Sequence, residues 1–242
     1  MTGFSEALMF LGMGDQGWGD ELLKGLMITL LLAFTALPLG LVLGALVAAL
    51  SESKQKLATT FAVFYTTVIR GLPELLTLFM IYHGVGLFIN HVIKGLNPDY
   101  GHFDFSPFLA GVIALGLVFS GYAAEVLRGA WQAIDKGQKE AGLSLAMSRF
   151  QIFWLIERPQ IMRLALPGLG NLWINLLKDT ALVSVIALDD LMRMTNIAVG
   201  ATKKPFLFYI TVCGIYWLIC ILFERVLARL EHGFNRGMKP RH

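Results

Sequence analysis

Long apolar runs alternate with short polar segments along most of this chain, as in proteins that cross a membrane several times. Each run reaches or exceeds the roughly 20 residues that an α-helix needs to cross about 30 Å of bilayer hydrocarbon. The runs cover residues 25–50, 57–93, 108–127, 164–188 and 206–227. We therefore predict an all-α integral membrane protein with about five transmembrane helices.

The second run is too long for one straight helix, and the sequence Arg-Gly-Leu-Pro at 70–73 interrupts it. Proline has no backbone N–H and its ring collides with the preceding helical turn. We therefore expect a kink or a broken helix there. The segments 90–107 and 189–205 contain the Gly, Pro, Asn and Asp residues that are typical of loops.

Composition supports the same class, because 56% of the 242 residues are hydrophobic and only 15% are charged. Such a chain forms one membrane bundle and leaves little room for a soluble domain. We expect a periplasmic N-terminal segment over residues 1–23, a transmembrane domain over 24–230 and a cytoplasmic tail over 231–242. The transmembrane domain includes a polar connector at 136–160.

The lysines and arginines predict which side of the membrane each segment faces. Cytoplasmic loops carry an excess of these residues. With the N-terminus outside, 13 of them fall in inner segments and 5 in outer segments, while Arg70 and Lys178 lie inside the membrane. The inner ones are Lys54, Lys56, Arg128, Lys136, Lys139, Arg149, Arg158, Arg163, Arg225, Arg229, Arg236, Lys239 and Arg241; the outer ones are Lys24, Lys94, Arg193, Lys203 and Lys204. The net charge of +3 then reflects topology and does not indicate a nucleic-acid partner.

The connector is predicted to contain a short helix over residues 137–148 on the cytoplasmic face. Gly137 offers a break, and Glu140 is placed in the first turn, where a helix favours negative charge. Ala141, Leu143, Leu145, Ala146 and Met147 form a small, apolar surface before Ser148 interrupts the helix. A helix tied at both ends to transmembrane spans can transmit a push from a soluble partner. A surface helix without a partner is the alternative.

Residues of this connector resemble the EAA loop of bacterial ABC importer permeases. Glu140, Ala141, Ala146, Ile156 and Pro159 fall at the spacing of that pattern. Three further stretches resemble the polar amino acid permeases, and most of all those for histidine, arginine, ornithine and opines. They are TTVIRGLPEL at 66–75, AAEVLRGAWQAIDKGQKEA at 123–141 and LKDTALVSVIALDDL at 177–191. The resemblance covers about residues 22–229.

This resemblance implies the type I permease architecture and a role as the transmembrane subunit of a binding-protein-dependent importer for basic or polar amino acids. It implies an ATP-binding cassette ATPase dimer, a second permease chain that is homologous or identical, and a periplasmic substrate-binding protein as partners in the bacterial inner membrane. ATP and Mg²⁺ would bind to the ATPase, and this chain would hold no cofactor. The ATPase-coupling residues would be Gly137, Glu140, Ala141, Gly142, Leu145 and Ala146.

Three positions depart from the loop pattern: Gly142 replaces its second alanine, Ala146 replaces its glycine, and Arg158 replaces the leucine before Pro159. If the glycine of the pattern supplies a left-handed turn, alanine there carries a steric penalty of about 1 kcal/mol or adopts another turn. Arg158 is expected at the cytoplasmic membrane edge, where its side chain can extend toward the headgroups of membrane lipid.

Charged residues inside the apolar runs are candidates for the substrate pathway, because a charge at the bilayer centre costs about 2.5–3.5 kcal/mol on insertion scales. Arg70 and Glu74 are four residues apart and are predicted to pair with each other. Lys178 and Asp179 point about 100° apart on a helix, so we expect at least one of them to face a hydrated pathway or another span. The candidate set is Arg70, Glu74, Lys178, Asp179, Thr180, Asp189 and Asp190.

Two interpretations of the acidic pair Asp189 and Asp190, at the outer end of the fourth run, stay open. A solvated loop tolerates two neighbouring carboxylates, and this is the simpler interpretation. The alternative is that they help to receive a cationic side chain of the substrate.

The sequence contains no GxxxxGK[ST] phosphate loop, so the chain is not expected to hydrolyse ATP by itself. Residues 142–146 approach a GxSxG motif, but that motif needs a strand, a sharp turn and a helix. The histidines show no metal-ligand spacing. We therefore predict a transport subunit with no catalytic residues and no metal site. The alternative is a stand-alone ion-coupled secondary transporter or channel, with Arg70, Glu74, Lys178 and Asp179 as coupling groups.

The predicted orientation can be tested with a reporter enzyme that is active only outside the cytoplasm. A fusion near Pro98 is expected to be active, whereas fusions near Gly137 or after Met238 are expected to be inactive, because 13 of the 18 loop charges then lie inside. The opposite pattern of activity would reverse the orientation and remove the connector from the cytoplasmic side.

Overall fold

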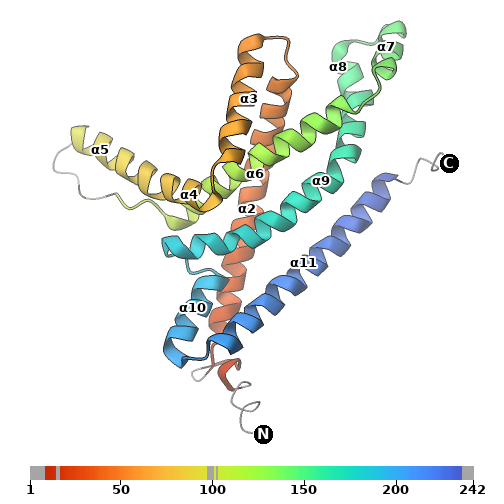
Figure 1. Cartoon of the computed structure of the whole chain (residues 1–242). Helices are drawn as coiled ribbons and strands as arrows, with labels where there is room; N and C mark the ends of the chain where they lie inside the picture. Colours follow the sequence, from red (N-terminus) through yellow and green to blue (C-terminus); the bar gives the residue numbers. More distant parts are fainter. Residues whose placement is uncertain (1–8, 15–16, 97–100, 102, 236–242) are drawn as a thin grey trace. The chain divides into compact units, whose positions relative to one another are not determined.

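In a computed structural model of the chain, residues 9–14, 17–96, 101 and 103–235 are described, and within these ranges the regular structure is entirely helical (Figure 1). Two short π-helices, η1 and η2, and one 3₁₀ helix, η3, lie next to the α-helices. The elements are α2 (Gly19–Ser51), α3 (Lys56–Gly71), α4 (Glu74–Phe79), η1 (Met80–Val85), α5 (Gly86–Leu96), α6 (Pro107–Gln132), α7 (Lys136–Ser144), α8 (Arg149–Ile152), η2 (Phe153–Glu157), α9 (Arg158–Asp179), η3 (Thr180–Ile186), α10 (Leu191–Thr202) and α11 (Pro205–Asn235).

Within the described ranges, four helical stretches are long and apolar enough to cross a membrane, which confirms the all-α membrane class. They are Gly19–Ser51, Glu74–Leu96, Pro107–Gln132 and Pro205–Gly233. The fourth apolar run of the sequence divides between α9 and η3. Helix α2 begins before Lys24 and α11 continues beyond residue 230, while residues 236–242 of the expected tail lie outside the described residues.

The break expected at 70–73 is present. Helix α3 ends at Gly71, and Leu72 has an extended backbone with φ −91° and ψ 140°. Pro73 disfavours helical geometry at the residue before it, and α4 starts at the next residue, Glu74. The long apolar run is therefore two separate helical pieces.

The described contacts divide the chain into two compact units. Unit 1 comprises Met1–Pro38, Pro73–Gly116 and Leu176–Cys220. Its core contains Leu22, Leu191, Ala198, Phe208 and Val212. A polar side chain satisfies a backbone group in this core: the Thr29 hydroxyl accepts a hydrogen bond from the buried Leu191 N–H at 3.1 Å.

Unit 2 comprises Leu39–Leu72, Leu117–Asn175 and Ile221–His242. Small residues let α2 approach α6 closely here, because a Cβ atom on Gly44 would lie 2.9 Å from the Ala123 Cβ and 3.1 Å from the Ser120 carbonyl oxygen. Ala48, one turn further along α2, is buried in a core cluster with Leu127 and Ala165. Such small residues are common where membrane helices pack closely.

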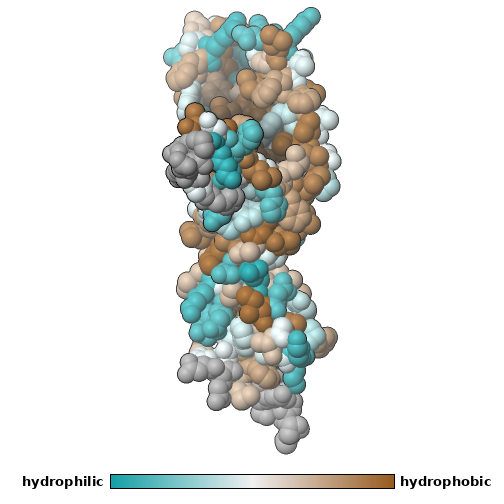
Figure 2. Space-filling view, turned by 90° about the vertical axis from the view of Figure 1, so that its left-hand side faces the viewer, coloured by the Kyte–Doolittle hydropathy of each residue, from teal (hydrophilic) through white to brown (hydrophobic). Residues whose placement is uncertain are grey.

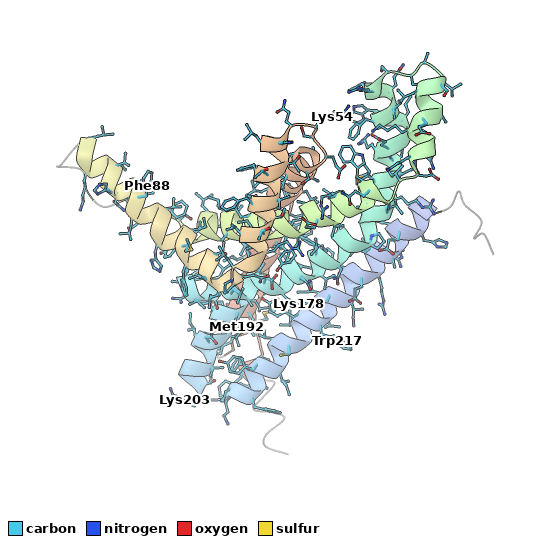
Figure 3. All side chains as sticks on the ribbon, turned by 45° about the horizontal axis from the view of Figure 1, so that its top comes forward. Lys54, Phe88, Lys178, Met192, Lys203 and Trp217 are labelled. Carbon is cyan, nitrogen blue, oxygen red and sulfur yellow. The ribbon has the colours of Figure 1, made fainter. Side chains whose placement is uncertain are left out.

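Large hydrophobic side chains remain on the surface of both units. Phe88 on α5 and Trp217 on α11 are 69% and 66% exposed and extend from their ribbons (Figure 3). Hydrophobic residues also cover much of the face seen in Figure 2. Exposed apolar surface on this scale indicates contact with lipid or with another chain.

Candidate functional site

The polar connector forms a helical hairpin, in which α7 folds back beside α8 and η2 (Figure 1). Asp135 caps α7, because its carboxylate accepts a hydrogen bond from the Gly137 N–H at 2.8 Å. The helix starts at Lys136, so Glu140 lies in its second turn and not in the first as expected. The helix also ends at Ser144 and is shorter than the predicted range 137–148.

A left-handed turn at Ala146 ends α7, with φ 56°. The N–H of Met147 donates to the Gly142 carbonyl at 3.1 Å, and the N–H of Ala146 donates to the Leu143 carbonyl at 2.9 Å. This pair of bonds is the Schellman arrangement, which usually has glycine at the left-handed position. Of the two turn geometries considered for Ala146, the structure therefore has the left-handed one.

Beyond this turn, the chain returns to the membrane through a second capped helix. The Ser148 hydroxyl accepts from the Gln151 N–H, and the Gln151 side chain accepts from the Ser148 N–H. This capping box satisfies two N–H groups at the start of α8. The interruption therefore lies at 145–147, and Ser148 starts the next helix.

Gly142 and Lys139 hold α7 against the rest of the connector. Gly142 is buried, and a Cβ atom on it would lie 3.0 Å from Ile152 Cγ1 and 3.1 Å from Ile156 Cδ1. An alanine here, as in the loop pattern, would require Ile152 and Ile156 to shift by a few tenths of an ångström, whereas glycine needs no shift. Lys139 Nζ lies 2.9 Å from Oε1 of Glu157, whose residue is only 6% exposed.

Sequence reasoning missed the Lys139–Glu157 pair. The two residues are 18 positions apart and belong to different helices, so no helical periodicity connects them. The available signal was Glu157 itself, because a carboxylate within an apolar stretch needs a cationic partner when it is buried.

The opposite surface of α7 is open. Glu140, Ala141, Leu145 and Ala146 are exposed, and the Leu145 side chain is 77% exposed. Among the expected coupling residues, only Gly142 is buried. The connector therefore presents a small apolar surface while its inner side is fixed.

The expected ion pair between Arg70 and Glu74 is wrong, because the helix breaks between them. Arg70 lies 3.8 Å from the carboxylate of Glu125, which also binds Arg128 at 2.6 Å. The Arg70 guanidinium also lies 5.6 Å from the centre of the Tyr122 ring. Arg70 is thus part of a structural cluster in unit 2.

Glu74 instead lies near Asp179 in unit 1, close enough for the two carboxyl groups to interact electrostatically. Both residues are half-buried, whereas Lys178 is exposed. Thr180 is fully buried, and its hydroxyl donates to the Leu177 carbonyl at 2.7 Å. The structure therefore brings together two of the predicted pathway residues, both acidic, from helices far apart in the sequence.

Asp189 and Asp190 do not act as one acidic pair. Asp190 is fully buried and caps α10 by accepting hydrogen bonds from the N–H groups of Met192 and Arg193. Burial raises the pKa of Asp190 to about 6, although these N–H donors favour its charged form. Asp189 is exposed and binds Arg193 at 3.0 Å. The interpretation as a solvated loop therefore holds for Asp189 and is wrong for Asp190.

No group of three His, Cys, Asp or Glu side chains that could hold a metal ion occurs among the residues the structure describes. Long apolar helices, exposed apolar side chains and a capped polar connector are typical of an integral membrane protein.

Comparison with known proteins identifies the family. Residues 36–236 match the family described as the binding-protein-dependent transport system inner membrane component. The chain is 40% identical over 235 residues to the octopine transport system permease protein OccQ of Rhizobium meliloti, which covers 96% of this chain and 99% of the relative. It is 37% identical over 224 residues to the histidine/lysine/arginine/ornithine transport system permease protein HisQ of Escherichia coli K12, covering 92% and 97%. The chain belongs to this permease family.

A solved structure agrees with the fold. The crystal structure of an amino acid ABC transporter with histidines matches this chain with a TM-score of 0.78 and 34% identity, over 89% of this chain and 94% of that one. The family and the fold confirm the resemblance drawn from the sequence. They also set aside the stand-alone secondary transporter.

The left-handed Ala146 gives a direct test of the connector geometry. Ala146→Gly is expected to stabilise the closed connector by about 1 kcal/mol, because it removes the Cβ contact that a left-handed residue suffers. Limited proteolysis of the connector should then slow about fivefold, since cleavage follows the open population. The control Ala141→Gly, in right-handed α7, should speed cleavage by a similar factor. Faster cleavage of Ala146→Gly would contradict the turn.

Proposed function

We propose that this chain is the permease subunit of a bacterial inner-membrane importer for basic amino acids or opines, driven by a separate ATPase pair. The observation that carries the proposal is α7, a short capped helix whose outer surface is exposed while Gly142 and Lys139 fix its inner side. Small side chains at Ala141 and Ala146 let a cleft of the ATPase close around it.

The route by which α7 would act on the membrane helices follows the chain. Lys139 binds Glu157 at the end of η2, and α9 begins at the next residue, Arg158. At its other end, α9 terminates at Asp179. A displacement of α7 would therefore be passed to the helix that carries one member of the carboxyl pair.

The carboxyl pair supports a cationic substrate. Two neighbouring carboxyl groups can bind a guanidinium or ammonium group of a substrate through charge-assisted hydrogen bonds. The names of the relatives agree with this chemistry, since they transport octopine or histidine, lysine, arginine and ornithine. Family membership further supports a periplasmic binding protein that delivers substrate and a second permease chain that completes the membrane pathway.

The coupling role of α7 can be tested by changing the size of its exposed surface. Ala141→Trp is expected to overfill a partner cleft at a cost of about 1–3 kcal/mol. Transport should fall about tenfold or more, and ATP hydrolysis should lose its response to loaded binding protein. Membrane insertion should be unchanged, because Ala141 lies outside the spans.

Two further variants make this test specific. Ala141→Ser keeps the side chain small and should retain transport. Glu140→Lys reverses a charge on exposed α7 and should impair coupling without affecting insertion. Normal transport by both Ala141→Trp and Glu140→Lys would show that α7 is not the coupling helix.

The substrate role of the carboxyl pair can be tested separately. Glu74→Gln and Asp179→Asn should each reduce arginine uptake into proteoliposomes about tenfold or more, because a hydrogen bond to a charged group contributes about 1.5–3 kcal/mol. Basal ATP hydrolysis and assembly should be retained. The control Asp189→Asn changes an exposed carboxylate and should leave uptake near wild type. Wild-type uptake by all three variants would exclude the pair from substrate binding.

A further inference from the structure

A groove on unit 2 is lined almost wholly by apolar side chains. Ala45, Ala48 and Ala49 of α2 line one side of it. Trp131 of α6, Trp154 of η2 and Ile161 of α9 line the other sides. The groove has a volume of about 300 Å³. Because the alanines are small, the groove forms a trough along α2.

One positively charged side chain, that of Arg158, lies beside this trough. The Arg158 guanidinium lies 4.3 Å from the centre of the Trp154 ring, a cation–π contact that holds the charge beside the groove. Two other cations of unit 2 have carboxylate partners, since Lys139 binds Glu157 and Arg128 binds Glu125. Over the described part of the chain, no such ion pair to Arg158 is found. Arg158 therefore has N–H groups available for an anion.

The groove lies beside the ends of α2 and α6 and the start of α9, which are the predicted cytoplasmic ends of these helices. Ala49 lies in the last turn of α2, which ends at Ser51. Trp131 precedes Gln132, the last residue of α6. Arg158 is the first residue of α9, near the end of the connector. The distribution of positive charges places these ends on the cytoplasmic side. Tryptophan and arginine are typical of this boundary, where ring and guanidinium reach the headgroups.

We propose that the groove binds one anionic phospholipid of the cytoplasmic leaflet. An acyl chain lies in the trough along the alanines, and a phosphate oxygen of the headgroup accepts hydrogen bonds from Arg158. Basic pockets between membrane helices on the cytoplasmic side bind anionic headgroups in this way. The proposal also gives a role to Arg158, the departure from the loop pattern that coupling does not explain, and it does not depend on which substrate is transported.

A transmembrane helix of a second chain is the other occupant to consider, because small residues on α2 also favour helix packing. The charge at the rim favours lipid. A partner helix would have to bring a carboxylate to Arg158 at the membrane edge, whereas an anionic phospholipid carries its phosphate at the depth of the headgroups. A phospholipid therefore satisfies both the apolar trough and the cation.

The test uses the full chain, purified with its co-purifying partners in mild detergent and supplied with equal amounts of phosphatidylglycerol and phosphatidylcholine. Native mass spectrometry then counts the lipid molecules retained per complex. The wild type should retain phosphatidylglycerol about fivefold over phosphatidylcholine, the factor expected for one arginine at a membrane surface. Arg158→Gln should remove this preference. Arg149→Gln, which changes an exposed arginine of the same connector outside the groove, should keep it.

A second variant tests the trough itself. Ala49→Leu places a larger side chain on its exposed wall and should reduce the number of retained lipids while leaving the complex assembled. If Arg158→Gln keeps the wild-type preference, the headgroup does not bind there and the proposal is wrong. It is equally wrong if Ala49→Leu retains the lipid but releases a co-purifying transmembrane chain, because the groove is then a helix interface.

Discussion

Hydrocarbon offers no hydrogen bonds, so every backbone N–H and C=O group inside a bilayer must find a partner within the protein. The long helices α2, α6 and α11 satisfy this constraint by their internal hydrogen bonds. Irregular backbone needs other partners. Asn90 shows one solution, because its side chain donates to the Phe103 carbonyl and accepts from the Phe103 N–H, both at 2.8 Å, and so fixes the segment that precedes α6.

Hydrocarbon also cannot solvate charged groups, so charged side chains inside the protein need partners as well. Arg70 and Arg128 share the carboxylate of Glu125, so these groups form a compact structural cluster. Glu74 and Asp179 differ, because two acidic groups lie close together there, with Lys178 as a neighbouring charge of Asp179. Two neighbouring carboxyl groups cost free energy inside a membrane, and this cost is the reason for proposing that they receive a cationic ligand.

The connector shows how departures from a loop pattern compensate one another. Gly142 has no Cβ, and this lets Ile152 and Ile156 pack directly against α7. Ala146 keeps the left-handed turn although alanine suffers there, and the two Schellman hydrogen bonds hold the turn in place. The hairpin thus keeps its shape with different residues. Its outer surface remains small and exposed, which is the basis for proposing that it couples to an ATPase.

Much of this architecture could be predicted from the sequence. The apolar runs, the break before Pro73 and the exposed polar connector follow from local composition, because length, hydropathy and proline geometry act over a few neighbouring residues. The motifs at 66–75, 123–141 and 177–191 were enough to indicate the family. The end of α7 was placed too late, since a left-handed alanine gives no clear local signal.

Partners across helices could not be predicted in this way. The sequence predicts an ion pair between Arg70 and Glu74, because they are four residues apart. It predicts that Asp189 and Asp190 form one acidic pair, because they are adjacent. The tertiary structure joined Arg70 to Glu125, Glu74 to Asp179 and Lys139 to Glu157, and it buried Asp190 as a helix cap. The sequence by itself therefore determined which segments are helices and where their charges stand. Only the packing of helices decided which charges meet, because contacts between residues far apart in the chain depend on how helix faces turn toward one another.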